Sequence, residues 1–308
     1  MAYAYTTDEF LSDLIKSARL PDGDNNYTND DLLHMADDEV QNSLAPLLKS
    51  LDEGFYIEPF FGSFSVGQAD YSIPRYAMWN AIYRVDLVEN GNFRILYRIE
   101  PDELSQYDQN ATGVPARFYP KHDVITFLPT PAAGVSVSYC MYIWRRPGAM
   151  VQTSAAAKVQ SVNYATGQVT YTAIPPTTFT SSSVHDFYSS VSPFRRIGTA
   201  VQATALAANV QTFPIASVAT LQAGDYVCML DETVFLPIPI ELKSFLRDLV
   251  IKQIAQDSVD AEKYQMQRAE ILERAKTAMK APGQRIFAQP KTMKVTQSPL
   301  LWGRRRWW

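Results

Sequence analysis

The residues with the clearest catalytic potential are Ser183, His185 and Asp186, which lie within four positions of one another. A hydroxyl, an imidazole and a carboxylate are the groups of a nucleophilic triad, in which the imidazole activates the hydroxyl for acyl transfer. Triads are assembled in space, however, and the glycine-flanked turn that presents a nucleophilic serine does not accompany these residues. The alternative is that His185 occupies the tip of a hairpin. The sequence therefore favours a protein that is not an enzyme.

Metal and nucleotide chemistry also have no motif in this sequence. The three histidines have no cysteine or second histidine at the spacing of metal ligands. Asp37, Asp38 and Glu39 are consecutive, so on a helix their carboxylates point in different directions and suit a solvated face better than a cation site. Neither a Walker loop nor a GxGxxG loop is present. We expect no catalytic residue, no metal and no cofactor.

The last 27 residues, 282–308, combine basic and aromatic side chains and contain no acid. Tryptophan and arginine are typical anchors of desolvated interfaces, which favours an arm that grips a partner. A frayed terminus and nucleic-acid binding by stacked rings are the alternatives. Disordered segments are poor in aromatic residues, whereas this tail has three tryptophans. The predicted contact residues are Arg285, Phe287, Trp302, Arg304, Arg305, Arg306, Trp307 and Trp308.

A helix of about forty residues is expected directly before this arm, over 237–281. Pro239 suits its first turn, and Pro282 with Gly283 is expected to end it. Its apolar residues recur at three- and four-residue steps, which gives one stripe that needs a packing partner. The predicted packing residues are Leu242, Phe245, Leu246, Leu249, Val250 and Ile254.

Two helices are expected at the beginning of the chain, within 1–54. Thr7 is predicted as the N-cap of the first, and Thr28 or Asn29 as the N-cap of the second. Pro46 lies inside the second helix and predicts a kink or a break there, because proline removes an intrahelical hydrogen bond.

The middle of the chain is predicted to be β structure. Over 55–150, short aromatic and β-branched runs alternate with turns, and Asn90-Gly91 is a strong hairpin signal. Over 151–236 charged residues are scarce and a Thr166-Gly167 turn separates two runs, which predicts a small β-barrel-like insert. Cys140 and Cys228 lie in strand-like contexts and are expected to be buried thiols.

The predicted fold is therefore α+β. It has N-terminal and long C-terminal helices that form a helical bundle, an antiparallel β-sheet or sandwich domain, a small β-barrel-like insert and an extended C-terminal arm. The predicted domains are 1–54, 55–150, 151–236, 237–281 and 282–308.

Charge is unevenly distributed along the 308 residues, although the net charge is only −4. The first 53 residues hold twelve acids and three bases, whereas the tail from Pro282 holds six bases. This asymmetry suits head-to-tail contacts between copies or an acidic partner groove for the tail, and the alternative for the N-terminal acids is a solvated helix face. The acidic body argues against a DNA-binding domain. No apolar run reaches the roughly 18 residues of a membrane span, and no signal peptide is visible, so synthesis in the cytoplasm is expected.

Several segments, taken in order, resemble a known family. They are YSIP (Tyr71–Pro74), RIEPDELSQYDQ (Arg98–Gln109), FYPKHDVITFLPTP (Phe118–Pro131), YIWRRPGAMV (Tyr142–Val151) and PIPIELKSFLRDLVIKQIAQ, which begins at Pro237. Together with the order of the predicted elements, they are similar to the head-to-tail connector, or portal adaptor, proteins of tailed bacteriophages. The resemblance extends from about Thr7 to Lys280.

This resemblance implies a structural virion protein at the head–tail interface, made in the cytoplasm of the bacterial host. Such adaptors dock on the portal as a ring, commonly a dodecamer, and link the capsid to the tail around the DNA channel. The implied partners are the portal protein, copies of the chain itself, a downstream neck or tail protein and passing genomic DNA without sequence recognition; no membrane is involved. The alternatives are another neck or tail component, such as a stopper, gatekeeper or tail-proximal ring, and a β-rich carbohydrate-binding module or enzyme.

Overall fold

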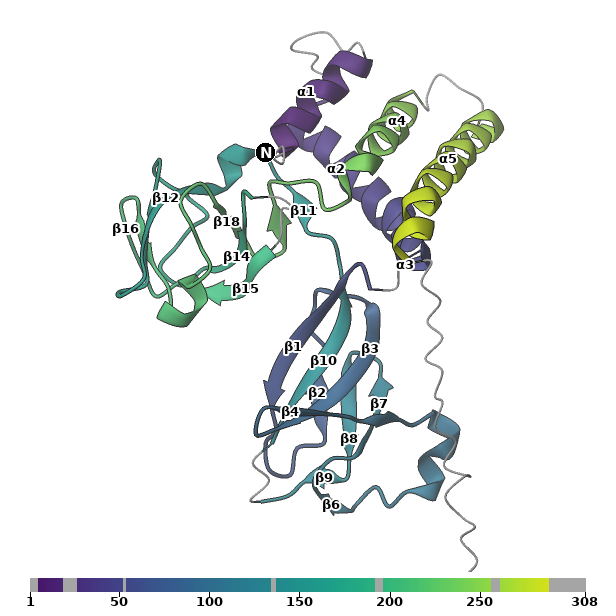
Figure 1. Cartoon of the computed structure of the whole chain (residues 1–308), viewed down its shortest axis with the longest axis vertical. Helices are drawn as coiled ribbons and strands as arrows, with labels where there is room; N and C mark the ends of the chain where they lie inside the picture. Colours follow the sequence, from purple (N-terminus) through teal and green to yellow (C-terminus); the bar gives the residue numbers. More distant parts are fainter. Residues whose placement is uncertain are drawn as a thin grey trace, which may run out of the picture.

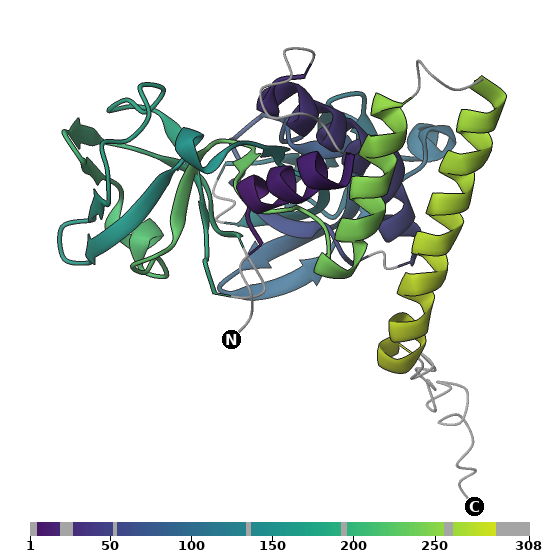
Figure 2. The ribbon, with the colours of Figure 1, turned by 90° about the horizontal axis from the view of Figure 1, so that it is seen from above.

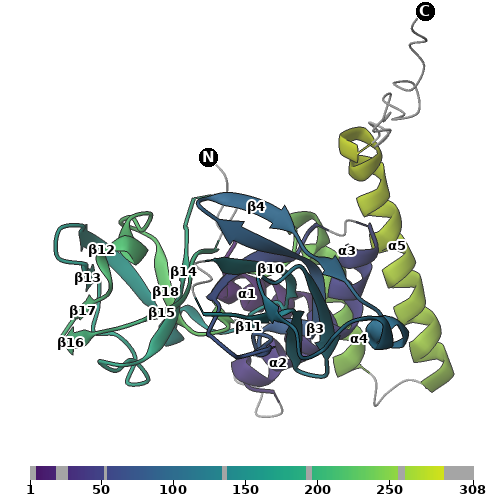
Figure 3. The same cartoon turned by 90° about the horizontal axis from the view of Figure 1, so that it is seen from below.

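The chain is organised around three hydrophobic cores, one helical and two formed by β-sheets. The computed structural model describes residues 5–18, 27–51, 54–133, 137–191, 196–255 and 261–287. Figure 1 shows the three parts: the insert with β12 to β18 on the left, the helices at the upper right and a β-sandwich below. Figures 2 and 3 show the insert and α5 at opposite ends of the molecule.

The predicted fold class is wrong. Strands account for more of the described residues than α-helices do and form five sheets, so the chain is mainly β rather than built on a helical bundle. The expected helix of about forty residues is absent from the described chain. A 3₁₀ turn (Ile240–Leu242) leads into α4 (Lys243–Ile254), and a separate helix, α5 (Ala261–Phe287), follows. The five domain boundaries stay a prediction.

α4 ends at Ile254, with Ala255 as its C-cap, and the structure describes the chain again from Ala261. The sequence in between contains Asp257, Ser258 and Asp260, which are residue types of low helix propensity. The expected end at Pro282 also differs from the structure, because α5 continues to Phe287. A helix loses one hydrogen bond at a proline, because proline has no backbone N–H. The fixed φ of proline is nevertheless a helical value, so α5 can continue through Pro282.

The sandwich forms from two four-stranded sheets that face each other. Their orders are β1-β10-β3-β4 and β2-β8-β7-β5. Val85, Met141 and Ile143 of the first sheet pack on Ile125 and Phe127 of the second in one buried core. The strands are β1 (Ile57–Ser63), β2 (Asp70–Ser72), β3 (Ala77–Glu89), β4 (Asn92–Ile95), β5 (Tyr97–Arg98), β7 (Arg117–Lys121), β8 (Val124–Leu128) and β10 (Ser138–Arg145), with β6 (Thr112–Gly113) and β9 (Thr130–Pro131) paired at one end.

The insert is a seven-stranded sheet of order β15-β14-β18-β12-β13-β17-β16. Its two edge strands, β15 and β16, are joined by only two residues, so the sheet must curl until its edges approach. Accordingly, Phe187 and Phe213 meet across the core with ring centroids 5.0 Å apart. The strands are β12 (Ala157–Asn163), β13 (Gln168–Tyr171), β14 (Val184–Tyr188), β15 (Arg196–Gln202), β16 (Ala205–Ala207), β17 (Val210–Thr212) and β18 (Tyr226–Met229).

The helices share one core that also takes in residues beside the insert. The N-terminal helices are α1 (Thr7–Ala18), α2 (Asn29–Glu39), a π-helical turn (Val40–Leu44) and α3 (Ala45–Leu51). The predicted kink or break at Pro46 takes the form of this π-helical turn, which ends two residues before the proline while the backbone at its two ends stays in the αR region. Thr28 caps α2 with a capping box, as predicted. The first cap differs by one residue, because the Glu9 N–H donates to the hydroxyl of Thr6 instead of Thr7.

A short stalk joins the insert to the rest of the chain. The chain enters the insert through β11 (Ala149–Met150) and leaves it through β19 (Glu232–Thr233), and these two strands pair in parallel. The carboxylate of Asp37 on α2 accepts from the Met150 N–H at 2.9 and 3.0 Å, which attaches the stalk to the helices. Sandwich, insert and helices therefore meet at β11, as Figure 1 shows.

Candidate functional site

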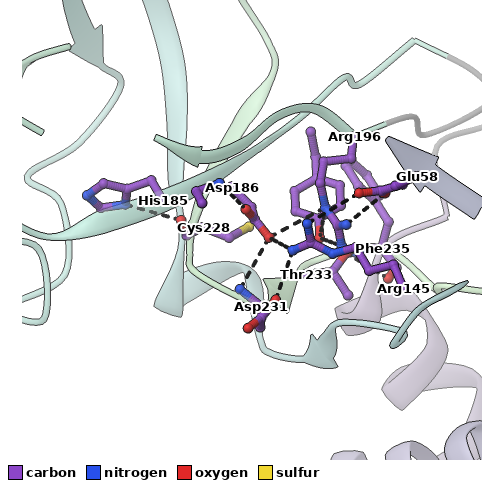
Figure 4. A network of polar contacts seen from close by, with 11 residues as sticks. Glu58, Arg145, His185, Asp186, Arg196, Cys228, Asp231, Thr233 and Phe235 are labelled. Atoms are coloured by element: carbon purple, nitrogen blue, oxygen red, sulfur yellow. Dashed lines mark hydrogen bonds and ion pairs between the residues drawn. The ribbon is translucent and has the colours of Figure 1, made fainter. Parts of the chain in front are cut away.

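The most concentrated set of charged side chains lies where the sandwich meets the insert, around Arg145. This residue ends β10 and is only 2% exposed. Its guanidinium donates to the carboxylates of Asp186 and Asp231, each at 2.8 Å, and lies 3.3 Å from Glu58. The aromatic ring of Tyr76 lies 4.1 Å beneath it. Figure 4 shows these groups converging from different parts of the chain.

Arg196 of β15 completes the network from the insert side. One of its NH groups donates to Glu58 at 2.9 Å, and its Nε and other NH group donate to the hydroxyl of Tyr188 at 3.0 and 2.8 Å. Glu58, on β1, thus presents one carboxylate oxygen to Arg196 and the other to Arg145. The two arginines hold sandwich and insert together through shared acids.

Asp186 is the most buried charge of the network, with no exposed surface. The N–H groups of Ala200 and Asp231 also donate to its carboxylate, at 2.9 and 3.2 Å. A buried carboxylate is tolerated only when cations and donors surround it, because its lost hydration must be replaced. The network therefore fixes the position of β14 relative to β10.

His185, next to Asp186 on β14, faces the opposite side of the sheet, as successive strand residues do. It is fully buried, so the hairpin-tip interpretation is wrong. Its Nδ1 donates to the carbonyl of Cys228 at 3.1 Å, and its Nε2 accepts from Gln211 at 3.0 Å. Burial lowers the pKa of His185 to about 4, so the imidazole is neutral at pH 7.

The triad arrangement is not assembled around this histidine. Ser183 Oγ lies 2.7 Å from His185 Nε2, but the partner of Nδ1 is a carbonyl, while Asp186 is bound to Arg145 on the other face. The orienting carboxylate that the mechanism needs is therefore directed away from the imidazole. Ser183 and His185 act as a packing and hydrogen-bonding pair within the insert.

An open cleft of about 480 Å³ borders the network. Arg145, Arg196 and Glu58 contribute to its wall, together with Tyr188 and Phe235. Arg145, Arg196 and Glu58 already pair with one another or with Asp186, so their charges are neutralised within the junction that the cleft borders. The arrangement is suited to holding the sandwich and the insert of one chain in a fixed relation.

The predicted packing residues lie in the helical core, with Phe245 and Ile254 half-buried and the other four fully buried: Leu242, Leu246, Leu249 and Val250. Arg285 and Phe287 belong to the last turn of α5, and their side chains lie outside the described set. The remaining predicted arm residues also lie outside the described residues, namely Trp302, Arg304, Arg305, Arg306, Trp307 and Trp308.

The sequence reasoning missed the junction itself. A signal was available, because Asp186 and Arg196 are charged residues in a segment where charges are scarce. Arg145 comes directly after a run of apolar and aromatic residues that is typical of a strand, and Arg146-Pro147 marks the end of that strand. The pairing of Arg145 with Asp186 joins residues far apart in the sequence, so no local spacing predicts it. Cys140 and Cys228 are free and buried, as predicted.

The described chain thus consists of a sandwich, an insert and a helical core, and the Arg145 junction joins the first two. Residues 11–174 match the SU10 adaptor protein family. This segment covers just over half of the chain and includes most of α1, the helices α2 and α3, the whole sandwich and the first hairpin of the insert. The chain therefore belongs to the SU10 adaptor protein family, a phage head–tail adaptor family. No curated protein matches the chain.

Family membership makes the chain a structural component of the virion that interacts with other head and tail proteins. No helix among the described residues is both long and apolar enough to span a bilayer.

Proposed function

We propose that this protein is the head–tail adaptor that docks on the portal as a ring and links the capsid to the tail around the DNA channel. The observation that carries the proposal is the match of residues 11–174 to the SU10 adaptor protein family. In this role the chain binds the portal, further copies of itself and a downstream neck or tail protein, and DNA passes without sequence recognition.

The Arg145 junction supports this role physically. A ring wall that carries load between capsid and tail needs subunits whose parts do not move against one another. Buried ion pairs with several shared acids meet this need, because separating the parts would expose unpaired charges in a desolvated site. The acidic first 53 residues and the basic tail also suit heterologous contacts, which generate closed rings.

The docking element in this proposal is the basic and aromatic end of the chain. Trp302, Trp307 and Trp308 insert between portal subunits, and Arg304–Arg306 pair with acids at the rims of those sites. Replacing a buried aromatic anchor by alanine costs about 2 kcal/mol or more at an interface. Because a ring repeats this loss at every subunit, docking is expected to fail while the fold of each subunit stays intact.

The test is binding to the portal protein encoded in the same genome. Full-length protein, a version ending at Phe287 and the double variant Trp307→Ala/Trp308→Ala are each mixed with portal and separated by sedimentation. We expect co-sedimentation of the full-length protein only, with circular dichroism unchanged in the double variant. Co-sedimentation of all three would reject the arm and keep the adaptor role. No binding by any of them would favour a neck or tail position further from the portal.

A further inference from the structure

A second charged site adjoins the cleft beside Arg196, with which it shares Arg146 and Pro147 as lining residues. Two adjoining cavities of about 200 Å³ each share Gln41, Arg146 and Pro147 as lining residues. The first cavity also has Arg75 in its wall, and the second has Trp79. We call this composite site the arginine groove.

The groove holds cations that lack described counter-ions. Arg75 and Arg146 are exposed, and neither makes an ion pair with a carboxylate among the described residues. Lys49 does not line either cavity; its ammonium group lies 3.8 Å from the ring centre of Trp144 and 5.4 Å from that of Trp79. The one acid in the lining, Asp231, is already bound to Arg145 at 2.8 Å. On a protein of net charge −4, this is a local surplus of positive charge.

The backbone at the groove is held in an unfavourable conformation. Trp79 and Asn80 are consecutive residues with φ of +53° and +52°, a region that residues with side chains rarely adopt. The Asn80 side chain donates to the carbonyl of His122 at 3.2 Å and stabilises this shape. Trp79 itself is 61% exposed. Strain of this kind concentrates at functional sites, where the structure maintains it for a purpose.

The other wall of the groove is also irregular. Gln41 and Asn42 belong to the π-helical turn between α2 and α3, and π-helical turns occur frequently at functional sites. Their side-chain amides can donate to and accept from a bound group. Guanidinium groups, side-chain amides and an exposed indole therefore face one small space.

We propose that the arginine groove binds an acidic polypeptide segment of a neighbouring virion protein. Guanidinium groups recognise carboxylates through paired, charge-assisted hydrogen bonds, and tryptophan with arginine forms the strongest anchors of protein interfaces. Cavities of about 200 Å³ accommodate single side chains. A DNA backbone instead needs a row of cations that follows its phosphates, whereas the cations that line the groove are two arginines, Arg75 and Arg146.

The test uses a fluorescein-labelled hexaglutamate peptide and fluorescence anisotropy at low salt, where exposed charges are least screened. We expect saturable binding by the wild-type protein, no binding of a hexaglutamine peptide, and affinity about tenfold lower or worse in Arg75→Glu/Arg146→Glu. The matched control, Arg94→Glu/Lys121→Glu, makes the same charge change at exposed sites of the same sandwich and should bind as wild type does.

Three results would overturn the proposal: no saturable binding of hexaglutamate by the wild-type protein, equal losses in the two double variants, or a labelled 12-base-pair duplex that binds at the groove in place of the peptide. Circular dichroism confirms that each variant is folded. Trp79→Ala, which leaves every arginine in place, should also weaken binding several-fold, because the indole is part of the proposed site. No portal is present in the assay, so this proposal and the docking proposal can fail independently.

Discussion

The replacement of Arg145 by methionine is the most direct perturbation of the junction between sandwich and insert. Methionine retains much of the side-chain length but removes the guanidinium that pairs with Asp186, which has no exposed surface. Asp186 then keeps the N–H groups of Ala200 and Asp231 and an ion pair with Arg196 at 3.4 Å. Breaking a buried ion pair by removing one partner costs roughly 3–5 kcal/mol of stability. Because Asp186 keeps these other partners, we expect a loss at the lower end of that range, about 3 kcal/mol.

The other two acids of Arg145 add little to this figure. The side chains of Glu58 and Asp231 are 35% and 42% exposed, so water can solvate them once the arginine is gone. Pairs with such access to solvent contribute about 0–1 kcal/mol. The expected loss therefore comes almost entirely from the desolvated charge on Asp186.

The assay is urea unfolding, followed by hydrogen exchange of peptides from β10 and β14 to locate the loss. With a slope of about 2–3 kcal/mol per molar urea, a loss of about 3 kcal/mol lowers the midpoint by roughly 1–1.5 M. The control is Arg98→Met, because the Arg98–Glu100 pair is more than half exposed on both sides. Arg145→Met/Asp186→Asn should be more stable than Arg145→Met alone, since it leaves no buried unpaired charge. If Arg145→Met shifts the midpoint no more than Arg98→Met, the account of the junction is refuted.

Three further predictions concern single groups. Burial raises the pKa of Asp37 from 3.8 to about 7. Between about pH 4 and pH 7, Asp37 is therefore protonated in the native state and ionised in the unfolded state. The free energy of unfolding of the wild type relative to Asp37→Asn should therefore fall as pH rises through that window, and a flat difference in urea titrations would contradict this. Gly167→Ala should lower the thermal midpoint of unfolding far more than Gly91→Ala does. Both glycines have positive φ, but a Cβ at Gly167 would collide with a backbone carbonyl oxygen, whereas a Cβ at Gly91 would meet no atom within 4 Å. Cys140 and Cys228 should react with iodoacetamide only after denaturation, because burial raises the pKa of both thiols; mass spectrometry of native protein that shows labelling would disprove their burial.

Features of the fold that depend on neighbouring residues could be predicted from the sequence. Asn90 and Gly91 both adopt positive φ between β3 and β4, as an Asn-Gly hairpin turn requires. Gly167 likewise makes the turn between β12 and β13. The capping box of Thr28 depends on residues three positions apart. Each of these features is determined by one or two side chains acting on their own backbone.

Features that depend on distant contacts could not be predicted in this way. The apolar stripe after Pro237 has the period of a single helix, and the period alone does not show that the chain breaks between α4 and α5. His185 and Asp186 suggested a catalytic pair because they are adjacent in the sequence. On a strand, adjacent side chains point to opposite faces, so His185 bonds to the Cys228 carbonyl and Asp186 pairs with Arg145. Asp186 and Glu58 pair with the same two arginines, Arg145 and Arg196. This arrangement depends on the insert folding back onto β1, and no local sequence pattern predicts that contact.

The central claim, that this protein is the adaptor between capsid and tail, is tested most directly by electron microscopy of the neck of assembled particles. The account predicts a ring of density directly against the portal, into which sandwich, insert and helices fit with the Arg145 junction intact. Density for this fold at the tail tip or elsewhere away from the portal, or a portal-adjacent ring that the fold does not fit, would contradict it.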